Sequence, residues 1–242
     1  MKKSLKLVIS TFAIAVTCCG CETNKTVEEP KVPTSNIISQ EDQEQSVNSR
    51  LLGMIKEKDI YLYGKWTEEG SYEQILLKNN TKEKEYNWKG VWKQPELLLA
   101  DLNSDGKEEL VTIITTGCGT GFMQEEIHII NLDTMDEYLV ENPINIVEGN
   151  VKTKLSSNNI IFSVGNQSAS AQLKPMSNSV VEEYKNLIYG TFMRYYVDNN
   201  TIKVSVDSKT NPTYSIAEFE VSYKFKNENF IKDKVSIKDI NK

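Results

Sequence analysis

The sequence is poor in the residues that build disulfides and transition-metal sites. It has four cysteines and one histidine, and three of the cysteines, Cys18, Cys19 and Cys21, lie together near the N-terminus. Cys118 is the one cysteine left for the rest of the chain, so we expect a domain without an internal disulfide. Outside the N-terminal group, one histidine and one cysteine also leave the ligand set of a zinc site incomplete.

The chain also lacks an excess of positive charge and a long apolar run. Its formal net charge is -6 at pH 7, which argues against binding nucleic acid or an anionic membrane surface through charge. The apolar run of residues 7–19 is shorter than the roughly 20 residues that a transmembrane helix needs. We therefore do not expect a basic nucleic-acid-binding module, and we do not expect the apolar run to form a membrane-spanning helix.

Residues 1–20 have the features of an export signal. Three lysines among the first six residues precede the apolar run, and small residues follow it. The end of the run, TCCGC at 17–21, resembles a bacterial lipobox, in which a small residue precedes the cysteine that receives a diacylglyceryl group. Gly20 makes Cys21 the predicted lipidation site, with Cys18 and Cys19 as alternative acceptors and an ordinary secretory signal as the alternative interpretation. The resemblance implies a lipoprotein on the extracytoplasmic face of a cell membrane.

The remaining chain divides into a polar segment and one domain. Residues 21–45 are polar and acidic and contain no aromatic residue, so they cannot bury enough apolar surface to fold and are predicted to form a disordered stalk. Residues 46–242 follow as a single domain, because a chain of this length can form one β domain.

The apolar patterns of this domain are mainly those of β-strands. Residues 46–58 and 179–189 have apolar positions at helical spacing, which predicts two short helices. Apolar or alternating runs bounded by turn residues predict strands at 60–63, 71–77, 96–100, 110–116, 126–130, 152–155, 160–164, 201–206 and 218–225. We therefore expect a mainly β fold with antiparallel sheets and one or two short helices.

The most informative run is DLNSDGKEEL at residues 101–110. Oxygen-bearing side chains stand at its first, third, fifth and ninth positions, and a glycine at the sixth permits a sharp turn. This spacing allows a short loop to surround a hard cation such as Ca²⁺. The predicted ligands are the side chains of Asp101, Asn103, Asp105 and Glu109 and the carbonyl group of Lys107. The alternative is an acidic turn that binds no ion.

The sequence around this run excludes an EF-hand. An EF-hand has helices on both sides and glutamate at the twelfth position, whereas this loop lies between two predicted strands and its twelfth position is Thr112. Residues 96–130 resemble the strand-loop-strand calcium site of FG-GAP or VCBS-type repeats. That resemblance implies β-propeller blades, often on extracellular proteins, although the signature occurs once here, so we expect part of a propeller at most. The layout is also similar to uncharacterised secreted and lipoprotein domains of Gram-positive bacteria, which implies no activity.

Three other patterns have simpler structural explanations. Residues 115–121 (TTGCGTG) precede a predicted strand rather than a helix, so we interpret them as a glycine-rich connection beside the ion loop and not as a phosphate site. Cys118 and His128 could pair as nucleophile and base, but we interpret them as a small buried thiol and a strand histidine. The aromatic residues between 61 and 92 are expected to fill the core and the strand edges rather than to stack on a sugar or peptide.

These patterns predict a lipid-anchored extracytoplasmic binding or structural module with one structural Ca²⁺ site and no catalytic residues. Its expected partners are the membrane, through the lipid, and an unidentified cell-envelope or protein ligand, with no nucleic acid. One alternative is a cell-envelope hydrolase that uses carboxylates, which a deep cleft with converging acids away from residues 101–109 would indicate. The other alternative is a solute-binding receptor lipoprotein, a class usually built from two α/β lobes.

Overall fold

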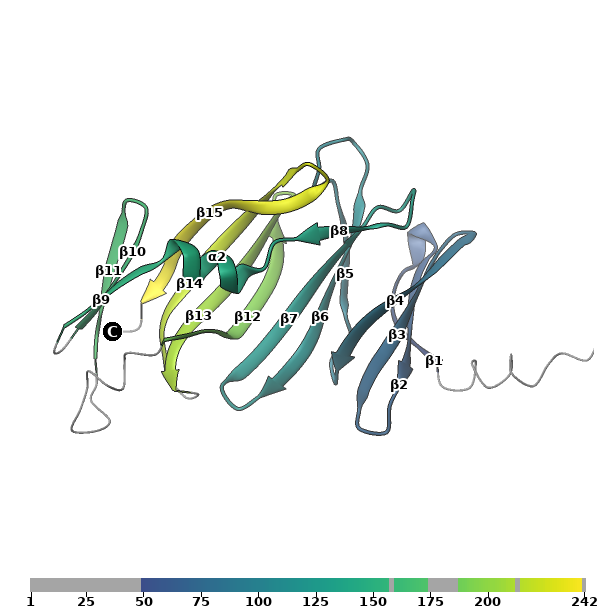
Figure 1. The fold of residues 1–242 in the computed structure, drawn as a ribbon. Helices are drawn as coiled ribbons and strands as arrows, with labels where there is room; N and C mark the ends of the chain where they lie inside the picture. Colours follow the sequence, from purple (N-terminus) through teal and green to yellow (C-terminus); the bar gives the residue numbers. More distant parts are fainter. Residues whose placement is uncertain (1–48, 157–158, 174–186, 212–213, 241–242) are drawn as a thin grey trace, which may run out of the picture. The chain divides into compact units, whose positions relative to one another are not determined.

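A computed structural model shows that the chain is mostly β-strand (Figure 1), and it describes residues 49–156, 159–173, 187–211 and 214–240. Within these residues there is one α-helix and one short 3-10 helix. The expected mainly β class with antiparallel sheets is therefore confirmed. No helix in the described part of the chain is long and apolar enough to cross a membrane.

Several predictions concern residues outside the described ranges. They are the export signal of residues 1–20, the lipidation of Cys21 and the stalk of residues 21–45. The helix predicted over 179–189 lies mostly outside them as well, and its last two residues, Ile188 and Tyr189, belong to a strand.

The first sheet is an antiparallel meander in the order β1-β2-β3-β4. Its strands are β1 (Ser49–Ile55), β2 (Ile60–Trp66), β3 (Ser71–Asn79) and β4 (Lys82–Val91), with the 3-10 turn η1 (Lys56–Lys58) after β1. Alternation along β3 buries Tyr72 on the inner face, and a bulge between Glu73 and Ile75 lets Ile75 and Leu77 continue on that face.

The helix predicted over residues 46–58 is wrong in its described part, because residues 49–55 form strand β1. Two of the residues that suggested a helical stripe, Leu51 and Met54, are exposed, and the buried residue of this segment is Leu52, which was not part of the stripe. Gly53 allows strand β5 (Glu96–Ala100) to approach closely, because a Cβ atom there would lie 2.8 Å from the side chain of Leu97. Pairing with β2 and this close approach decide the conformation over the weak helical pattern.

The largest sheet has the order β12-β13-β14-β15-β8-β7-β6-β5, and β12 also pairs with β7. This additional pairing joins β7, β8, β15, β14, β13 and β12 into a closed ring of strands, with β6 and β5 extending beyond it. The bounds are β5 (Glu96–Ala100), β6 (Glu109–Gly119), β7 (Phe122–Ile130), β8 (Glu137–Val140), β12 (Ile188–Asp198), β13 (Thr201–Asn211), β14 (Tyr214–Lys226) and β15 (Asn229–Ile240).

Strand β6 is buried on both faces because it lies between two hydrophobic clusters. Val111 and Ile113 belong to the larger cluster, whereas Leu110 and Ile114 belong to the cluster beneath the β1–β4 meander. All four side chains are at most 4% exposed. This position explains why residues 110–114 are continuously apolar instead of alternating.

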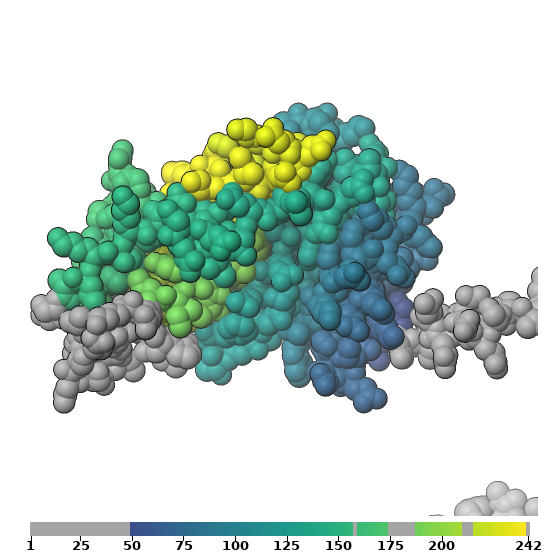
Figure 2. Space-filling model, viewed as in Figure 1, coloured from purple at the N-terminus to yellow at the C-terminus, as the bar shows by residue number. Residues whose placement is uncertain are grey.

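Helix α2 (Pro143–Asn150) and a small sheet complete the larger cluster. Asn142 caps the helix, and its side-chain oxygen accepts hydrogen bonds from the backbone of Ile144 and Asn145. The helix contacts β12 to β15. In Figure 1 it lies across β13 and β14, and in the space-filling view (Figure 2) the helix and the residues next to it cover part of these strands. The small sheet consists of β9 (Lys152–Leu155), β10 (Asn159–Val164) and β11 (Gln167–Gln172).

All nine predicted strands are present, and those predicted at 96–100 and 152–155 coincide with β5 and β9. A propeller is a ring of several four-stranded sheets. Within the described residues there is one four-stranded sheet, beside sheets of three and eight strands.

Candidate functional site

The acidic loop joins β5 to β6, as the strand-loop-strand interpretation predicted. The two strands are antiparallel, with Ala100 opposite Glu109, so the start and end of the loop lie side by side. Ser104 and Gly106 both have positive φ angles, of 64° and 87°. Glycine at position 106 is therefore required by the backbone conformation, although a Cβ atom there would meet no other atom within 4 Å.

Backbone hydrogen bonds fold the loop around its side-chain oxygens. The carboxylate of Asp101 accepts from the backbone N–H groups of Asp105 and Gly106, each at 3.1 Å. Oδ1 of Asn103 accepts from the Asp105 N–H at 2.8 Å, and Oδ1 of Asp105 accepts from the Lys107 N–H at 2.8 Å. The side chains at the first, third and fifth positions are therefore tied to the backbone of the loop, although Asp105 remains exposed.

Glu109 contributes a buried carboxylate to this loop. It is 2% exposed, and it accepts hydrogen bonds at 2.9 Å from the Leu102 N–H and from the side-chain amide of Asn103. Burial raises the pKa of the Glu109 carboxyl, and the negative charges of Asp105 and Asp101 raise it further. The hydrogen bonds from Leu102 and Asn103 act in the opposite direction.

Two lysines at or near the loop pair with acids that are not among its predicted ligands. Nζ of Lys107 lies 2.6 Å from the carboxylate of Asp133, and Nζ of Lys58 lies 3.1 Å from that of Glu108. The contact between Lys107 and Asp133 lowers the pKa of Asp133 and raises that of Lys107. Within the described residues Glu109 forms no ion pair, so its charge is opposed only by hydrogen bonds.

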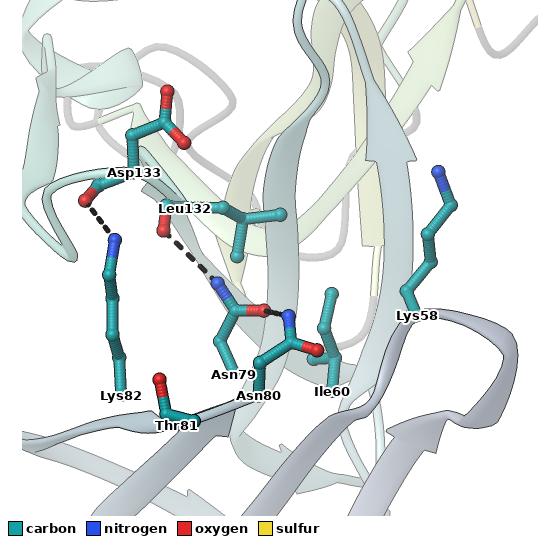
Figure 3. A pocket seen from close by; sticks show the side chains of 8 residues that line it. All are labelled: Lys58, Ile60, Asn79, Asn80, Thr81, Lys82, Leu132 and Asp133. Atoms are coloured by element: carbon teal, nitrogen blue, oxygen red, sulfur yellow. Dashed lines mark hydrogen bonds between the residues drawn. The ribbon is translucent and has the colours of Figure 1, made fainter.

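A polar hollow of about 300 Å³ lies beside the loop and is lined by Lys58 and Asp133 (Figure 3). Nζ of Lys82 donates to the Asp133 carbonyl, and the side-chain amide of Asn79 donates to the carbonyl of Leu132 at 3.0 Å. These bonds attach the turn after β7 to the β1–β4 meander. Two residues that line the hollow, Lys58 and Asp133, are also the ones that pair with Glu108 and Lys107 of the loop.

The predicted ligands have the right chemistry for Ca²⁺, but they are not arranged as a preformed cage. In the part of the chain that the structure describes, no three His, Cys, Asp or Glu side chains are placed to hold a metal ion. The side-chain nitrogen of Asn103 lies between the carboxylates of Asp105 and Glu109, at 3.1 and 2.9 Å. The partly positive amide nitrogen of Asn103 thus already occupies the space between these two carboxylates, where a bound hard cation would neutralise them.

A second polar group, which sequence reasoning did not predict, centres on His128 in β7. Its Nδ1 lies 2.7 Å from the carboxylate of Glu137 in β8, which also accepts a hydrogen bond at 3.0 Å from the indole N–H of Trp88. The imidazole stacks on Trp88, with ring centroids 4.1 Å apart and 15° between the planes. The one available signal was the alternation that places Glu126 and His128 on one face of a strand.

The structure does not bring Cys118 and His128 together. Cys118 lies opposite Met123 at the far end of the β6–β7 hairpin, whereas His128 lies opposite Thr112. Cys118 is exposed, so the prediction of a buried thiol is wrong. The glycine-rich segment 115–121 lies at the end of β6 away from the ion loop, so the prediction that it adjoins the loop is also wrong.

The aromatic residues between 61 and 92 are core residues in part. Tyr72, Tyr86 and Trp88 are buried in the cluster beneath the meander, as predicted, and Trp66 packs partly buried against it. Trp92, which directly follows β4, is 73% exposed and is not a core residue.

Comparisons of the chain with protein families, with curated proteins and with solved structures found no match.

Proposed function

We propose that this protein is a non-catalytic binding or structural module that carries one structural Ca²⁺ ion in the loop of residues 101–109. The observation that carries the proposal is the buried carboxylate of Glu109, which faces Asp101 and Asp105 and forms no ion pair among the described residues. A buried charge costs free energy unless it is paired or bound to a metal. A divalent cation would neutralise these acids and fix the turn between β5 and β6.

The residues that would hold the ion are Asp101, Asn103, Asp105 and Glu109 through their side chains and Lys107 through its carbonyl group. All are oxygen donors, the type that Ca²⁺ takes, and the loop contains no soft ligand. The backbone bonds to Asp101 and Asp105 use part of each carboxylate's accepting capacity and leave the remaining lone pairs for an ion.

We further propose that a lipid on Cys21 holds the module at the extracytoplasmic face of a cell membrane. The support comes from the sequence alone: a basic start, a short apolar run and Gly20 before Cys21. Residues 21–45 would then act as a flexible tether. With a net negative charge on the chain, the lipid rather than a basic patch would provide the attachment.

Two alternatives are less well supported by the geometry. A carboxylate-based hydrolase would use the acids near His128, but Glu137 is held by His128 and Trp88, and Glu125 accepts the backbone N–H of Tyr195. These bonds hold both carboxylates in place and leave Glu126 as the remaining acid of this group, whereas such a hydrolase needs a pair of carboxylates. A solute receptor would usually have two α/β lobes, whereas the described residues contain one α-helix, of eight residues.

The direct test is isothermal titration of the chelator-treated protein with Ca²⁺. We expect one site per chain, with a dissociation constant on the order of 10⁻⁴–10⁻³ M, as in extracellular modules. Asp105→Ala should abolish this site. Asp136→Ala, which removes an exposed aspartate outside the loop, should retain it. No binding heat in the wild type, or equal binding by the Asp105→Ala variant, would contradict the calcium proposal.

A further inference from the structure

A hollow of about 430 Å³ lies beside the polar group of His128, between β7, β8, β12 and the start of α2. On this side β7 pairs with β12 at Met123 and with β8 at Ile129 and Ile130. The intervening part of β7 has no further strand-ladder partner there among the described residues. The hollow thus lies at an opening in the closed ring of strands, and its volume is in the usual range for small-ligand sites.

The lining of this hollow is acidic with apolar walls. Three carboxylates, those of Glu125, Glu126 and Glu137, line it without any lysine or arginine, and Ile127 and Met193 are among the apolar residues. An anionic ligand is disfavoured by these charges. The N-terminus of α2 does not offset them, because the first free backbone N–H groups of the helix are already bound by the side chain of Asn142.

His128 presents an unused hydrogen-bond acceptor at this site. The carboxylate of Glu137 at 2.7 Å from Nδ1 requires a proton on Nδ1, which leaves Nε2 as a bare acceptor in the neutral ring. His128 is 9% exposed and lines the hollow, yet Nε2 has no hydrogen-bond partner among the described residues. A buried acceptor without a donor costs free energy, so a donor from a ligand would be favoured here.

The second acceptor is Glu126, whose carboxylate lies 3.9 Å from Nε2 of His128. Its side chain is 58% exposed and can turn toward an incoming group. One ammonium nitrogen can lie at hydrogen-bond distance, about 2.9 Å, from two acceptors with this separation. An alcohol could satisfy Nε2, but it would leave the three carboxylates without positive charge.

We infer that this hollow binds a primary ammonium group carried on a short apolar stem, with Nε2 of His128 and the carboxylate of Glu126 as its acceptors. The carboxylates of Glu125 and Glu137 add favourable charge, and the apolar walls accommodate the stem. The ammonium group belongs to a small amine or to a lysine side chain. This site is separate from the calcium loop and does not depend on it.

His128 is the only histidine in the chain, so its ring gives a single set of imidazole signals in nitrogen NMR. Addition of cadaverine, a five-carbon diamine, or of Nα-acetyl-lysine amide should shift the Nε2 signal saturably. A response to cadaverine alone identifies a small amine, and a response to both includes a lysine side chain. Pentanol, which has the same stem without the charge, should cause no saturable shift.

The matched variants are Glu126→Gln and Glu85→Gln, which each neutralise an exposed glutamate in a strand. Glu126→Gln should weaken amine binding by about tenfold or more, because it removes a charge-assisted hydrogen bond. Glu85→Gln should leave binding unchanged. The inference is overturned if neither amine shifts the signal, if pentanol or Ca²⁺ produces the same shift, or if Glu126→Gln binds as tightly as the wild type. The titration should give the same result in chelator and in calcium, so its failure is distinguishable from failure of the calcium proposal.

Discussion

Tyr72 of β3 fills the space in front of Gly90 of β4, the residue directly opposite it in the strand register. A Cβ atom at position 90 would lie 2.2 Å from the tyrosine ring, which is fully buried. The tyrosine hydroxyl also donates to the carbonyl of Lys93 at 3.1 Å, which fixes the chain after β4. The pair therefore sets how closely the two strands pack and where β4 ends.

Gly90→Ala should destabilise the domain, because the added methyl group forces the Tyr72 ring out of its packed position. We expect a loss of about 1–3 kcal/mol in the free energy of unfolding, the usual cost of overpacking a core. Denaturant unfolding measures the change. Gly119→Ala is the matched control, because a Cβ atom there meets nothing within 4 Å. Equal stability of the two variants would show that the tyrosine can move without cost.

Calcium should stabilise the folded domain if it binds the loop of residues 101–109 only in the native state. At a concentration about 100 times the dissociation constant, the stabilisation should be about 2.7 kcal/mol. Thermal melting in chelator and in calcium at about 100 times the dissociation constant, on the order of 10⁻²–10⁻¹ M for the affinity expected above, measures this difference, and Asp105→Ala should remove it. Identical melting temperatures of the wild type in the two conditions would leave the loop as an ordinary acidic turn.

The calcium-free protein should have a component of stability that depends on Glu109 and decreases with rising pH. Because the folded-state pKa of Glu109 is raised, the folded protein holds its proton more tightly than the unfolded chain does. This stability is fully present below the ordinary glutamate pKa of about 4.3, and it is lost as the pH rises through the raised folded-state pKa.

The contribution of Glu109 can be isolated by comparing the pH dependence of unfolding in chelator for the wild type and for Glu109→Gln. Subtraction is needed because Asp133 and Asp136 have lowered pKa values and contribute in the opposite direction. The wild type should lose stability relative to the variant as the pH rises above about 4.3. A difference that is constant with pH would contradict the raised pKa.

Lipid attachment should depend on Cys21. Metabolic labelling with a fatty acid should mark the wild type, and Cys21→Ala should abolish the label, because Gly20 precedes that cysteine in the lipobox-like run. Cys118→Ala, which changes an exposed cysteine of the folded domain, should be labelled like the wild type. Continued labelling of Cys21→Ala would move the attachment to Cys18 or Cys19, and an unlabelled wild type would remove the lipoprotein interpretation.

The parts of the fold that sequence reasoning predicted are those where local signals agree. Strand β5 follows Pro95 and ends at the acidic loop, so both of its boundaries are visible in the sequence. The long β15 was missed because its many lysines and aspartates obscure the alternation, and most of its residues are exposed or half-buried. Helix α2 was missed although Asn142-Pro143 is a helix start signal, because the helix has only eight residues.

The two candidate sites differ in the same respect, because the sequence predicted one of them and not the other. The calcium loop is contiguous, so its spacing alone predicted the side chains that the fold gathers between β5 and β6. The group around His128 draws on Trp88 and Glu137, which come from different strands of two sheets. No spacing in the sequence relates these residues, and only the packing of the β1–β4 meander on β6 and β7 brings them into contact.

The burial of β6 on both faces makes the alignment of this one strand decisive for the whole domain. Leu110 and Val111 are neighbours in the sequence, yet they point into different hydrophobic clusters. A slip of β6 by one residue would exchange the two sets of side chains and disrupt both clusters together. The loop that ends at Glu109 determines where β6 begins, so an ion bound there would hold the strand in register. The two clusters should consequently melt in one cooperative transition, and loss of the ion should lower the temperature of that transition without splitting it.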